Sequence, residues 1–118
     1  MPHIVIYNLA PSDFKKERIL KIERAIEKAI LDISELELTY IDIGYSFLQD
    51  PTITSDAISV VIIVELLFDK PKRTFKVRQR LAQKIGEAFK SAVKWRNLPK
   101  LEVAVKRFNP EKDGFYSG

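Results

Sequence analysis

The sequence predicts an α+β fold made of two fused βαβ units. Two amphipathic helical segments alternate with four strand-like segments, in the order β-α-β followed by β-α-β. The two halves, 1–57 and 58–118, keep similar spacing: Ser12 and Thr74, expected to cap the helices, are almost as far apart along the chain as Leu38 and Leu101. We therefore expect one domain, 1–118, built from a duplicated unit, with a four-stranded sheet and both helices on one face. The alternative for this element order is a ferredoxin-like split βαβ domain.

In the first half, Ile4 to Leu9 alternates and predicts a strand, which Ala10-Pro11-Ser12-Asp13 ends. The following segment is expected to be a helix with Ser12 as its N-cap. Its apolar residues recur every three or four positions, which is typical of a half-buried helix: Ile19, Ile22, Ala25, Ile26, Ala29, Ile30 and Ile33. Thr39 to Leu48 alternates again and predicts the second strand.

The second half begins after a polar connection, Gln49 to Ala57. Ile58 to Phe68 is almost continuously apolar, which predicts a strand covered on both faces. Thr74 is expected to cap a second helix that Asn97-Leu98-Pro99 ends, and Leu101 to Arg107 predicts the fourth strand, followed by a turn-rich tail. The apolar stripe of this helix consists of Val77, Leu81, Ile85, Ala88, Phe89, Ala92 and Val93.

Composition excludes several classes of protein. The chain has 118 residues, 46% of them hydrophobic and 31% charged, which suits one compact domain. It has no cysteine and one histidine, so disulfides, thiol catalysis, zinc-thiolate sites and histidine-based metal sites are not expected. No nucleotide-binding glycine motif is present, and we expect no cofactor. The longest apolar stretch is too short to span a bilayer and no signal-like segment opens the chain, so a cytoplasmic protein without membrane association is expected.

Pro2 is the candidate catalytic residue. It stands between Met1 and the apolar run that starts the first strand. If Met1 is removed, the strand begins with a secondary amine, and burial or a neighbouring cation lowers the pKa of an amine towards neutrality. Such an amine can act as a general base. The structural alternative is that proline is simply tolerated at the first position of a strand.

Met1-Pro2-His3 followed by an apolar strand resembles the tautomerase superfamily, which includes 4-oxalocrotonate tautomerase, 5-carboxymethyl-2-hydroxymuconate isomerase and macrophage migration inhibitory factor. The resemblance implies a catalytic N-terminal proline, two fused βαβ units and a homotrimer. Lys72-Arg73-Thr74, followed by Arg78-Gln79, looks like the stretch that enters the second helix of the hydroxymuconate isomerase. It implies that Arg73 lies where family members place a cation for a substrate carboxylate. The tail from Arg107 to Tyr116 is most similar to bacterial members with no assigned substrate.

Two departures from the family pattern concern arginine. Ala10-Pro11-Ser12-Asp13 looks like the Gly-Arg-Ser-Asp of the short tautomerases with Pro11 in place of the arginine. No arginine opens the second strand either, where Thr39-Tyr40-Ile41 stands. Because these two arginines are absent, the substrates of the known enzymes are not assigned to this chain.

We therefore expect a cofactor-independent tautomerase or isomerase acting on a small carboxylate-bearing 2-oxo or enol acid. Pro2 is the expected base and acid, and Arg73 and Lys72 are the expected partners of the substrate carboxylate, although this charged turn could equally be a solvated surface. Phe115 and Tyr116 either wall the pocket, which makes Tyr116 a substrate-binding candidate, or pack on a neighbouring subunit.

A homotrimer also follows from the layers. Two helices can cover only one face of the sheet, so the other face must meet a partner. A second hypothesis is a non-catalytic interaction protein on the same scaffold. A third, suggested by the net charge of +4, is a ferredoxin-like RNA-binding domain. Nucleic acid is not the expected partner, because the central apolar strand lacks aromatic residues for base stacking.

Overall fold

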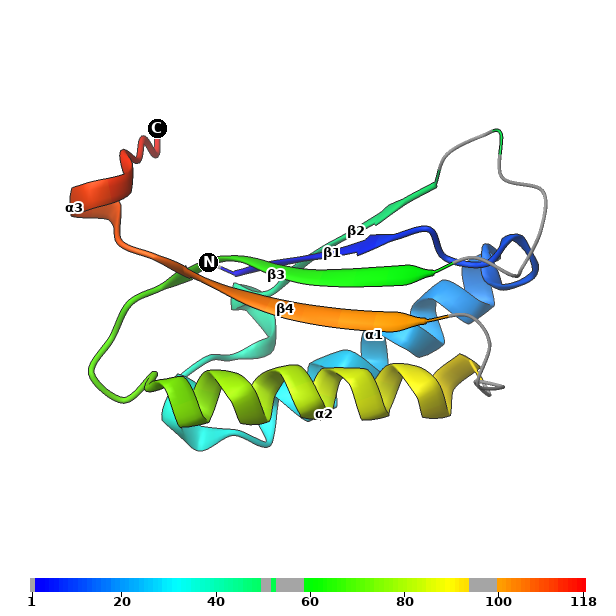
Figure 1. Ribbon diagram of the computed structural model, residues 1–118, viewed down its shortest axis with the longest axis horizontal. Helices are drawn as coiled ribbons and strands as arrows, with labels where there is room; N and C mark the ends of the chain where they lie inside the picture. The colour runs from blue at the N-terminus through cyan, green and yellow to red at the C-terminus, as the bar shows by residue number, and fades with distance from the viewer. Residues whose placement is uncertain (1, 50–51, 53–58, 94–99) are drawn as a thin grey trace.

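The computed structural model describes residues 2–49, 52, 59–93 and 100–118. Four strands form one sheet, and the two long helices lie against one of its faces (Figure 1). The predicted α+β class and the single-face arrangement of the helices are confirmed. The elements, in chain order, are β1 (His3–Tyr7), the 3-10 helix η1 (Pro11–Asp13), α1 (Lys16–Leu31), the 3-10 helices η2 (Ser34–Leu36) and η3 (Tyr40–Asp42), β2 (Gly44–Leu48), β3 (Val60–Phe68), α2 (Phe75–Val93), β4 (Leu101–Phe108) and α3 (Pro110–Asp113).

The sheet has the strand order β2-β1-β3-β4. β1 pairs with β2 in parallel, β3 pairs with β4 in parallel, and the central strands β1 and β3 are antiparallel to each other. Each half of the chain therefore forms one parallel βαβ unit, and the two units meet along β1 and β3.

The register of the sheet repeats between the two units. Tyr45 lies opposite Ile4, and Val103 lies opposite Ile62, so paired positions are separated by the same length of chain in both units.

The core lies between the sheet and the two helices. Burying these aliphatic side chains stabilises the layer packing by roughly 1.5–3 kcal/mol per large side chain. The most buried large residues, each less than 2% exposed, are Phe89, Ile4, Ile6, Leu9, Ile22, Ile26, Ile30, Leu36, Ile62, Leu67, Leu81 and Ile85. All but Leu36 lie in the strands or on the helix stripes that the sequence predicted.

Helix α1 begins later than predicted. Its N-cap is Lys15, and Ser12 lies inside the 3-10 helix η1. Pro11 explains this, because its fixed φ favours the first turn of a separate short helix. The prediction for α2 is confirmed at its start, where Val77 donates its backbone N–H to Thr74 Oγ1 at 3.3 Å. The predicted stop at 97–99 lies outside the described residues.

The predicted strand over 39–48 is wrong in its first part. Asp42 accepts hydrogen bonds from both the backbone N–H and the hydroxyl of Thr39, at 2.8 and 2.9 Å, and this capping box closes η3. Such local side-chain bonds compete with strand pairing, so β2 starts only at Gly44. Likewise, the tail contains the short helix α3, capped by the Asn109 side chain.

Strand β3 carries a bulge at Glu65-Leu66. Val64 pairs with Val105 and Leu67 with Arg107, so two residues of β3 stand opposite one of β4. Leu66 adopts a left-handed φ of 56°, which is strained for a non-glycine residue. The bulge keeps Leu67 on the core side and turns Phe68 towards the site described below.

None of the helices in the described part of the chain is long and apolar enough to cross a membrane.

Candidate active site

Pro2 lines a cavity of about 160 Å³. The proline is buried, and it lies at the start of β1, beside the end of β3 and the segment that follows α1. The other lining residues are Glu37, Leu38, Asp42, Phe68, Lys70 and Arg73. The structure thus brings the two leading sequence candidates, Pro2 and Arg73, into one cavity from opposite halves of the chain.

The backbone of Pro2 is hydrogen-bonded to strand β2. Its carbonyl oxygen accepts a hydrogen bond from Gly44 N at 3.1 Å, which extends the β1–β2 ladder by one residue. Gly44 is required here by space, since a Cβ at this position would lie 2.5 Å from Nδ1 of His3. The His3 ring is itself fixed, because its Nε2 lies 2.6 Å from Ser46 Oγ.

Arg73 is buried, only 5% exposed, and its guanidinium binds backbone carbonyls. Nε and Nη2 donate to the carbonyl oxygen of Leu36 at 3.1 and 2.6 Å, and Nη1 donates to that of Phe68 at 2.8 Å. A guanidinium has five N–H donors, so at most two remain for a ligand. Arg73 therefore supplies a fixed positive charge to the cavity wall and also ties two chain segments together.

The charge of Arg73 is balanced inside the site. Burial lowers the pKa of the Arg73 guanidinium, and the nearby carboxylates of Glu37 and Asp42 act in the opposite direction. Arginine nonetheless keeps its proton in proteins. The Arg73 carbonyl in turn accepts a hydrogen bond from Arg78 Nη1 at 2.6 Å.

Two carboxylates in the wall were not predicted as site residues. Hydrogen bonds from the backbone and side chain of Thr39 lower the pKa of Asp42, so this group is ionised at neutral pH. Glu37 reaches the wall from a left-handed backbone conformation, with φ of 54°. No local pattern in the sequence marks either residue, because the cavity forms only when the segment after α1 meets the end of β3.

Lys70, which the sequence analysis did not single out, lines the cavity. Lys72 is exposed and does not line the cavity in this chain, and its contact with a substrate stays a prediction. The signal that could have found Lys70 was its place directly after the third strand, since strand ends are where site residues gather. Lys70, together with Arg73, gives the cavity its two cations.

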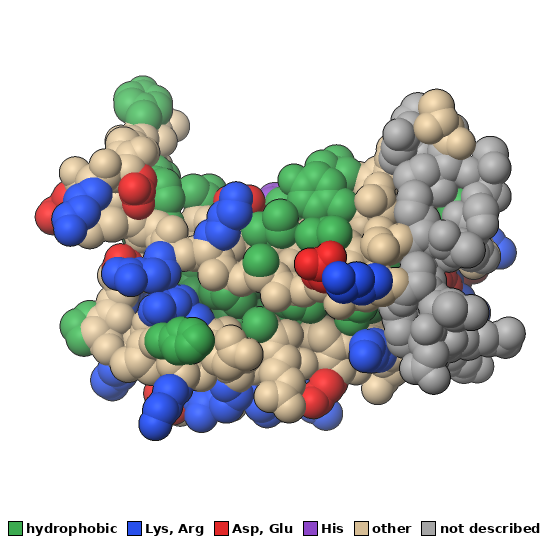
Figure 2. Space-filling model, in the orientation of Figure 1, with side chains coloured by type: hydrophobic (Ala, Val, Ile, Leu, Met, Phe, Trp, Pro, Cys, Tyr) green, Lys and Arg blue, Asp and Glu red, His purple; other side chains and the backbone are tan. Residues whose placement is uncertain are grey.

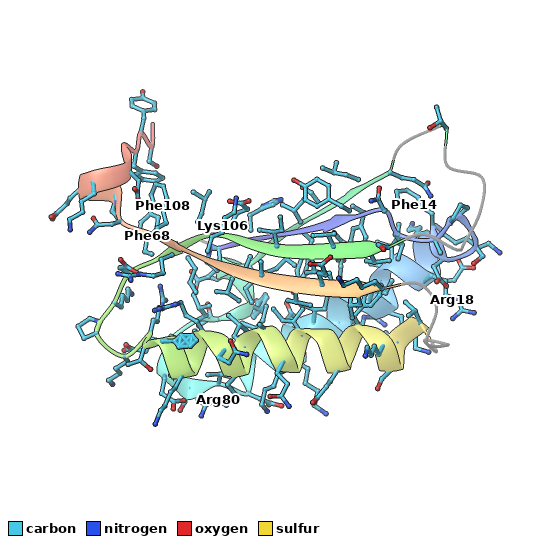
Figure 3. The ribbon with its side chains drawn as sticks, viewed as in Figure 1. Phe14, Arg18, Phe68, Arg80, Lys106 and Phe108 are labelled. Carbon is cyan, nitrogen blue, oxygen red and sulfur yellow. The ribbon has the colours of Figure 1, made fainter. Side chains whose placement is uncertain are left out.

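Phe68 connects the cavity to an aromatic cluster formed by Phe68, Phe108 and Phe115. Figure 3 shows Phe68 and Phe108 side by side beneath the C-terminal tail, with ring centroids 5.5 Å apart. Phe115 packs edge-on against both, at 5.2 and 5.8 Å. Tyr116, the substrate-binding candidate of the tail, is 89% exposed and does not line the cavity.

Glu65 lies on the sheet opposite His3. Its carboxylate forms an ion pair with Lys106 at 3.2 Å. Among the described residues, no group of three or more histidine, cysteine or acidic side chains is placed to hold a metal ion.

The fold matches solved structures of the tautomerase superfamily. A fused 4-OT described as an asymmetric trimer is 17% identical, with a TM-score of 0.69 over 96% of this chain and 91% of that one. A member of the cis-3-chloroacrylic acid dehalogenase family is 14% identical, with a TM-score of 0.70 over 98% and 81%. A malonate semialdehyde decarboxylase inhibited by 3-bromopropiolate is 18% identical, with a TM-score of 0.58 over 100% and 90%.

No family model and no curated protein sequence matches the chain. At these identities the structural likeness defines the fold: the chain has the tautomerase fold, as its resemblance implied.

Proposed function

We propose that this protein is a cofactor-independent tautomerase or isomerase that moves a proton next to the carbonyl group of a small 2-oxo or enol acid. The observation that carries the proposal is the burial of Pro2 in a small cavity whose wall holds two cations. A cavity of about 160 Å³ is well below the usual range of roughly 300–1,000 Å³ for ligand pockets, which favours a compact substrate.

The chemistry requires that Met1 be removed so that Pro2 carries a free secondary amine. Burial and the positive charges of Lys70 and Arg73 favour the neutral amine, whereas the carboxylates of Glu37 and Asp42 in the same wall favour its protonated form. The neutral nitrogen takes a proton from the enol hydroxyl or from the carbon beside the carbonyl, and returns it at the other end of the conjugated system. The proton count is unchanged, and no oxidant or cofactor is needed.

In this proposal, Lys70 and Arg73 both interact with negative charge on the substrate. Lys70 is exposed at the cavity and can reach the substrate carboxylate, while the buried guanidinium of Arg73 stabilises negative charge as the enolate develops. Lys72 and Tyr116 remain predicted substrate contacts. Neither lines the cavity in the single chain, so substrate binding or a neighbouring subunit would have to move them to it.

We further propose that the protein works as a homotrimer. The sheet face opposite the helices is left open in one chain (Figure 1), and apolar residues of β1 and β3, such as Val5, Val61 and Ile63, lie on it. A similar fused 4-OT is described as a trimer, which supports this assembly.

A non-catalytic role is the second candidate, and the bonding of Arg73 favours it. At least three of its five N–H donors are satisfied by carbonyl oxygens, which is what a purely structural arginine needs. Under this hypothesis the scaffold binds a partner without turnover.

Enol-to-keto conversion of phenylpyruvate by protein whose intact mass shows loss of Met1 tests the proposal. An N-terminally extended chain, in which the Pro2 nitrogen is acylated and no longer basic, is expected to lower kcat/KM by about 10²–10⁴-fold, the usual contribution of a general base. Pro2→Ala keeps a primary N-terminal amine in place of the secondary amine, so a smaller loss is expected. Pro11→Ala is the matched control, because Pro11 opens η1 away from the cavity and should leave the rate unchanged. Equal rates for all four proteins would leave only the non-catalytic role.

A further inference from the structure

The wall of the Pro2 cavity carries charges of both signs. Lys70 and Arg73 supply two cations, and Glu37 and Asp42 supply two carboxylates. Figure 2 shows further lysine and arginine side chains around the start of α2, the end of the helix that the turn carrying Lys70 enters. This end of the molecule attracts anions, and a carboxylate in the cavity wall opposes that attraction. The carboxylates of the wall therefore need an explanation beyond the binding of an acid.

Two of the four charged groups already have partners in the protein. Arg73 donates three hydrogen bonds to the carbonyl oxygens of Leu36 and Phe68. Asp42 accepts both hydrogen bonds of the Thr39 capping box at one carboxylate oxygen. Each of these two groups has a structural role apart from any ligand.

Glu37 and Lys70 are the charged groups that remain. Both residues are exposed, and neither forms an ion pair with another residue in the described part of the chain. They reach the cavity from different elements, because Glu37 follows η2 and Lys70 follows β3. A free cation and a free carboxylate in one small cavity match a ligand that carries both charges.

The neighbouring backbone fixes Glu37 at the cavity. Its φ of 54° lies in the left-handed region, which a glycine would adopt with less strain. Leu36, the residue before it, is fully buried, and its carbonyl oxygen is held by Nε and Nη2 of Arg73. The N–H of Glu37 donates to the carbonyl oxygen of Ser34 at 3.0 Å. A carboxylate is thus presented to the cavity from a firmly held segment, at a position where its own backbone is unfavourable.

We propose that the Pro2 cavity selects a zwitterionic substrate, a small 2-oxo or enol acid that also carries an ammonium group. The substrate carboxylate binds Lys70, and the ammonium group binds Glu37. An acid without the ammonium group leaves Glu37 unpaired and is repelled by it, so the same residue discriminates against simple acids. This inference rests on the proposed function for the reacting part of the substrate and leaves the proton transfer at Pro2 unchanged.

The alternative partner of Glu37 is the protonated amine of Pro2. In that case Glu37 stabilises the protonated amine and acts alike on every acid that enters the cavity. The proposal instead requires that Glu37 distinguish acids with an ammonium group from acids without one. The two roles therefore differ in a ratio of affinities.

Matched pairs of small acids measure this ratio without turnover. The probes are β-alanine, 4-aminobutyrate and 5-aminopentanoate, each compared with the straight-chain acid of the same length. None has a keto group, and the series covers a range of separations between the two charges. NMR titration of the nitrogen-15-labelled protein gives the dissociation constants, with shifts expected at the amides of Glu37, Leu38 and Lys70. In at least one pair, the amino acid is expected to bind about threefold more tightly or better, as for a favourable exposed ion pair.

Glu37→Gln is expected to bring this ratio to about one, without weakening the binding of the simple acid. Glu35→Gln is the matched control: it removes the same charge two residues earlier, at a side chain that pairs with Arg80 and does not line the cavity, and it should keep the ratio. Lys70→Met should weaken both members of each pair, because it removes the partner of their shared carboxylate.

Three results would overturn the inference: equal affinities within every pair for the parent protein, a preference that survives in Glu37→Gln, or amide shifts that lie outside the cavity. The ratio is also independent of catalysis. A protein that shows the preference but does not convert phenylpyruvate would defeat the proposed function alone, and one that converts phenylpyruvate without the preference would defeat this inference alone.

Discussion

Arg73 donates two hydrogen bonds to the carbonyl oxygen of Leu36, and so joins the entrance of α2 to the segment that follows α1. Its third bond, to the Phe68 carbonyl, reaches the end of β3. The residue expected from the sequence to hold a substrate carboxylate therefore also holds together the wall of the cavity in which that carboxylate would bind.

Arg73→Ala is expected to lower the free energy of unfolding by about 2–4 kcal/mol, because two carbonyl oxygens lose a charged donor in a buried position. Urea denaturation followed by circular dichroism measures this loss. Arg73→Lys should restore only part of it, since an ammonium group cannot reproduce the fork. Lys72→Ala, at the exposed neighbour, is the control and should leave the midpoint unchanged. Unaltered stability of Arg73→Ala would mean that the arginine serves ligands alone.

Gly44→Ala should destabilise the protein by about 1–3 kcal/mol, because the new methyl group meets the His3 ring. The strand must then shift at the residue whose N–H binds the Pro2 carbonyl, so activity should fall as well. Replacing His3 by alanine in the same chain removes the obstacle. A double-mutant cycle in urea should show that His3→Ala recovers most of the loss, whereas simply additive losses would place the strain elsewhere.

The sequence correctly predicted the helices and strands whose regularly spaced apolar side chains pack into the core. The apolar stripes of α1 and α2 and the alternation of β1 and β4 are found as predicted, because a shift of any of these elements by one residue would expose isoleucine and valine side chains to water. The prediction failed where a local bond competes with the period: Thr39 to Asp42 alternates like a strand, yet the capping box folds it into a 3-10 helix.

The site was predictable to the extent that it depends on residue type. Pro2, singled out for the chemistry of its amine, and Arg73, singled out through the family resemblance, both line the cavity. Glu37, Asp42 and Lys70 were missed because only the meeting of two distant segments brings them to the cavity. The carbonyl partners of Arg73 are backbone atoms, which no residue pattern can indicate.

Tyr45→Phe is expected to leave stability unchanged or to raise it by about 1 kcal/mol. The Tyr45 hydroxyl is buried without a hydrogen-bond partner among the described residues, and an unpaired buried hydroxyl costs free energy. Burial and the nearby carboxylates of Glu27 and Glu23 raise the pKa of Tyr45, so the neutral phenol persists at physiological pH. The thermal unfolding midpoint of Tyr45→Phe is compared with that of Tyr40→Phe, a control at a side chain that is 67% exposed. A clear loss in Tyr45→Phe alone would reveal a partner for the hydroxyl.

Acid should selectively weaken the turn before β2. The hydrogen bonds of Thr39 lower the pKa of Asp42 below its ordinary value of 3.8, so the ionised group stabilises the folded state above that value, and the contribution is lost as pH falls through the lower folded pKa. Asp42→Asn should therefore be less stable than the parent chain at neutral pH, and the gap should close in strong acid. Urea midpoints across the acid range measure both curves. A gap that stays constant with pH would mean that the charge of Asp42 is irrelevant to the turn.

The proposed trimer depends on the open face of the sheet, on which Ile63 lies between Val5 of β1 and Ala104 of β4. Ile63 is on β3 opposite Val5, on the side of the sheet away from α1 and α2. Ile63→Lys places a charge on this apolar surface, and burying it against a second chain without a partner is strongly unfavourable. The expected result is a folded monomer, seen as a threefold drop in mass by light scattering with an unchanged circular dichroism spectrum. Ile41→Lys, at a side chain that is 66% exposed in η3, is the matched control and should remain a trimer. If Ile63→Lys keeps the parental mass, the chains must assemble through another surface, and the open face would need a different explanation.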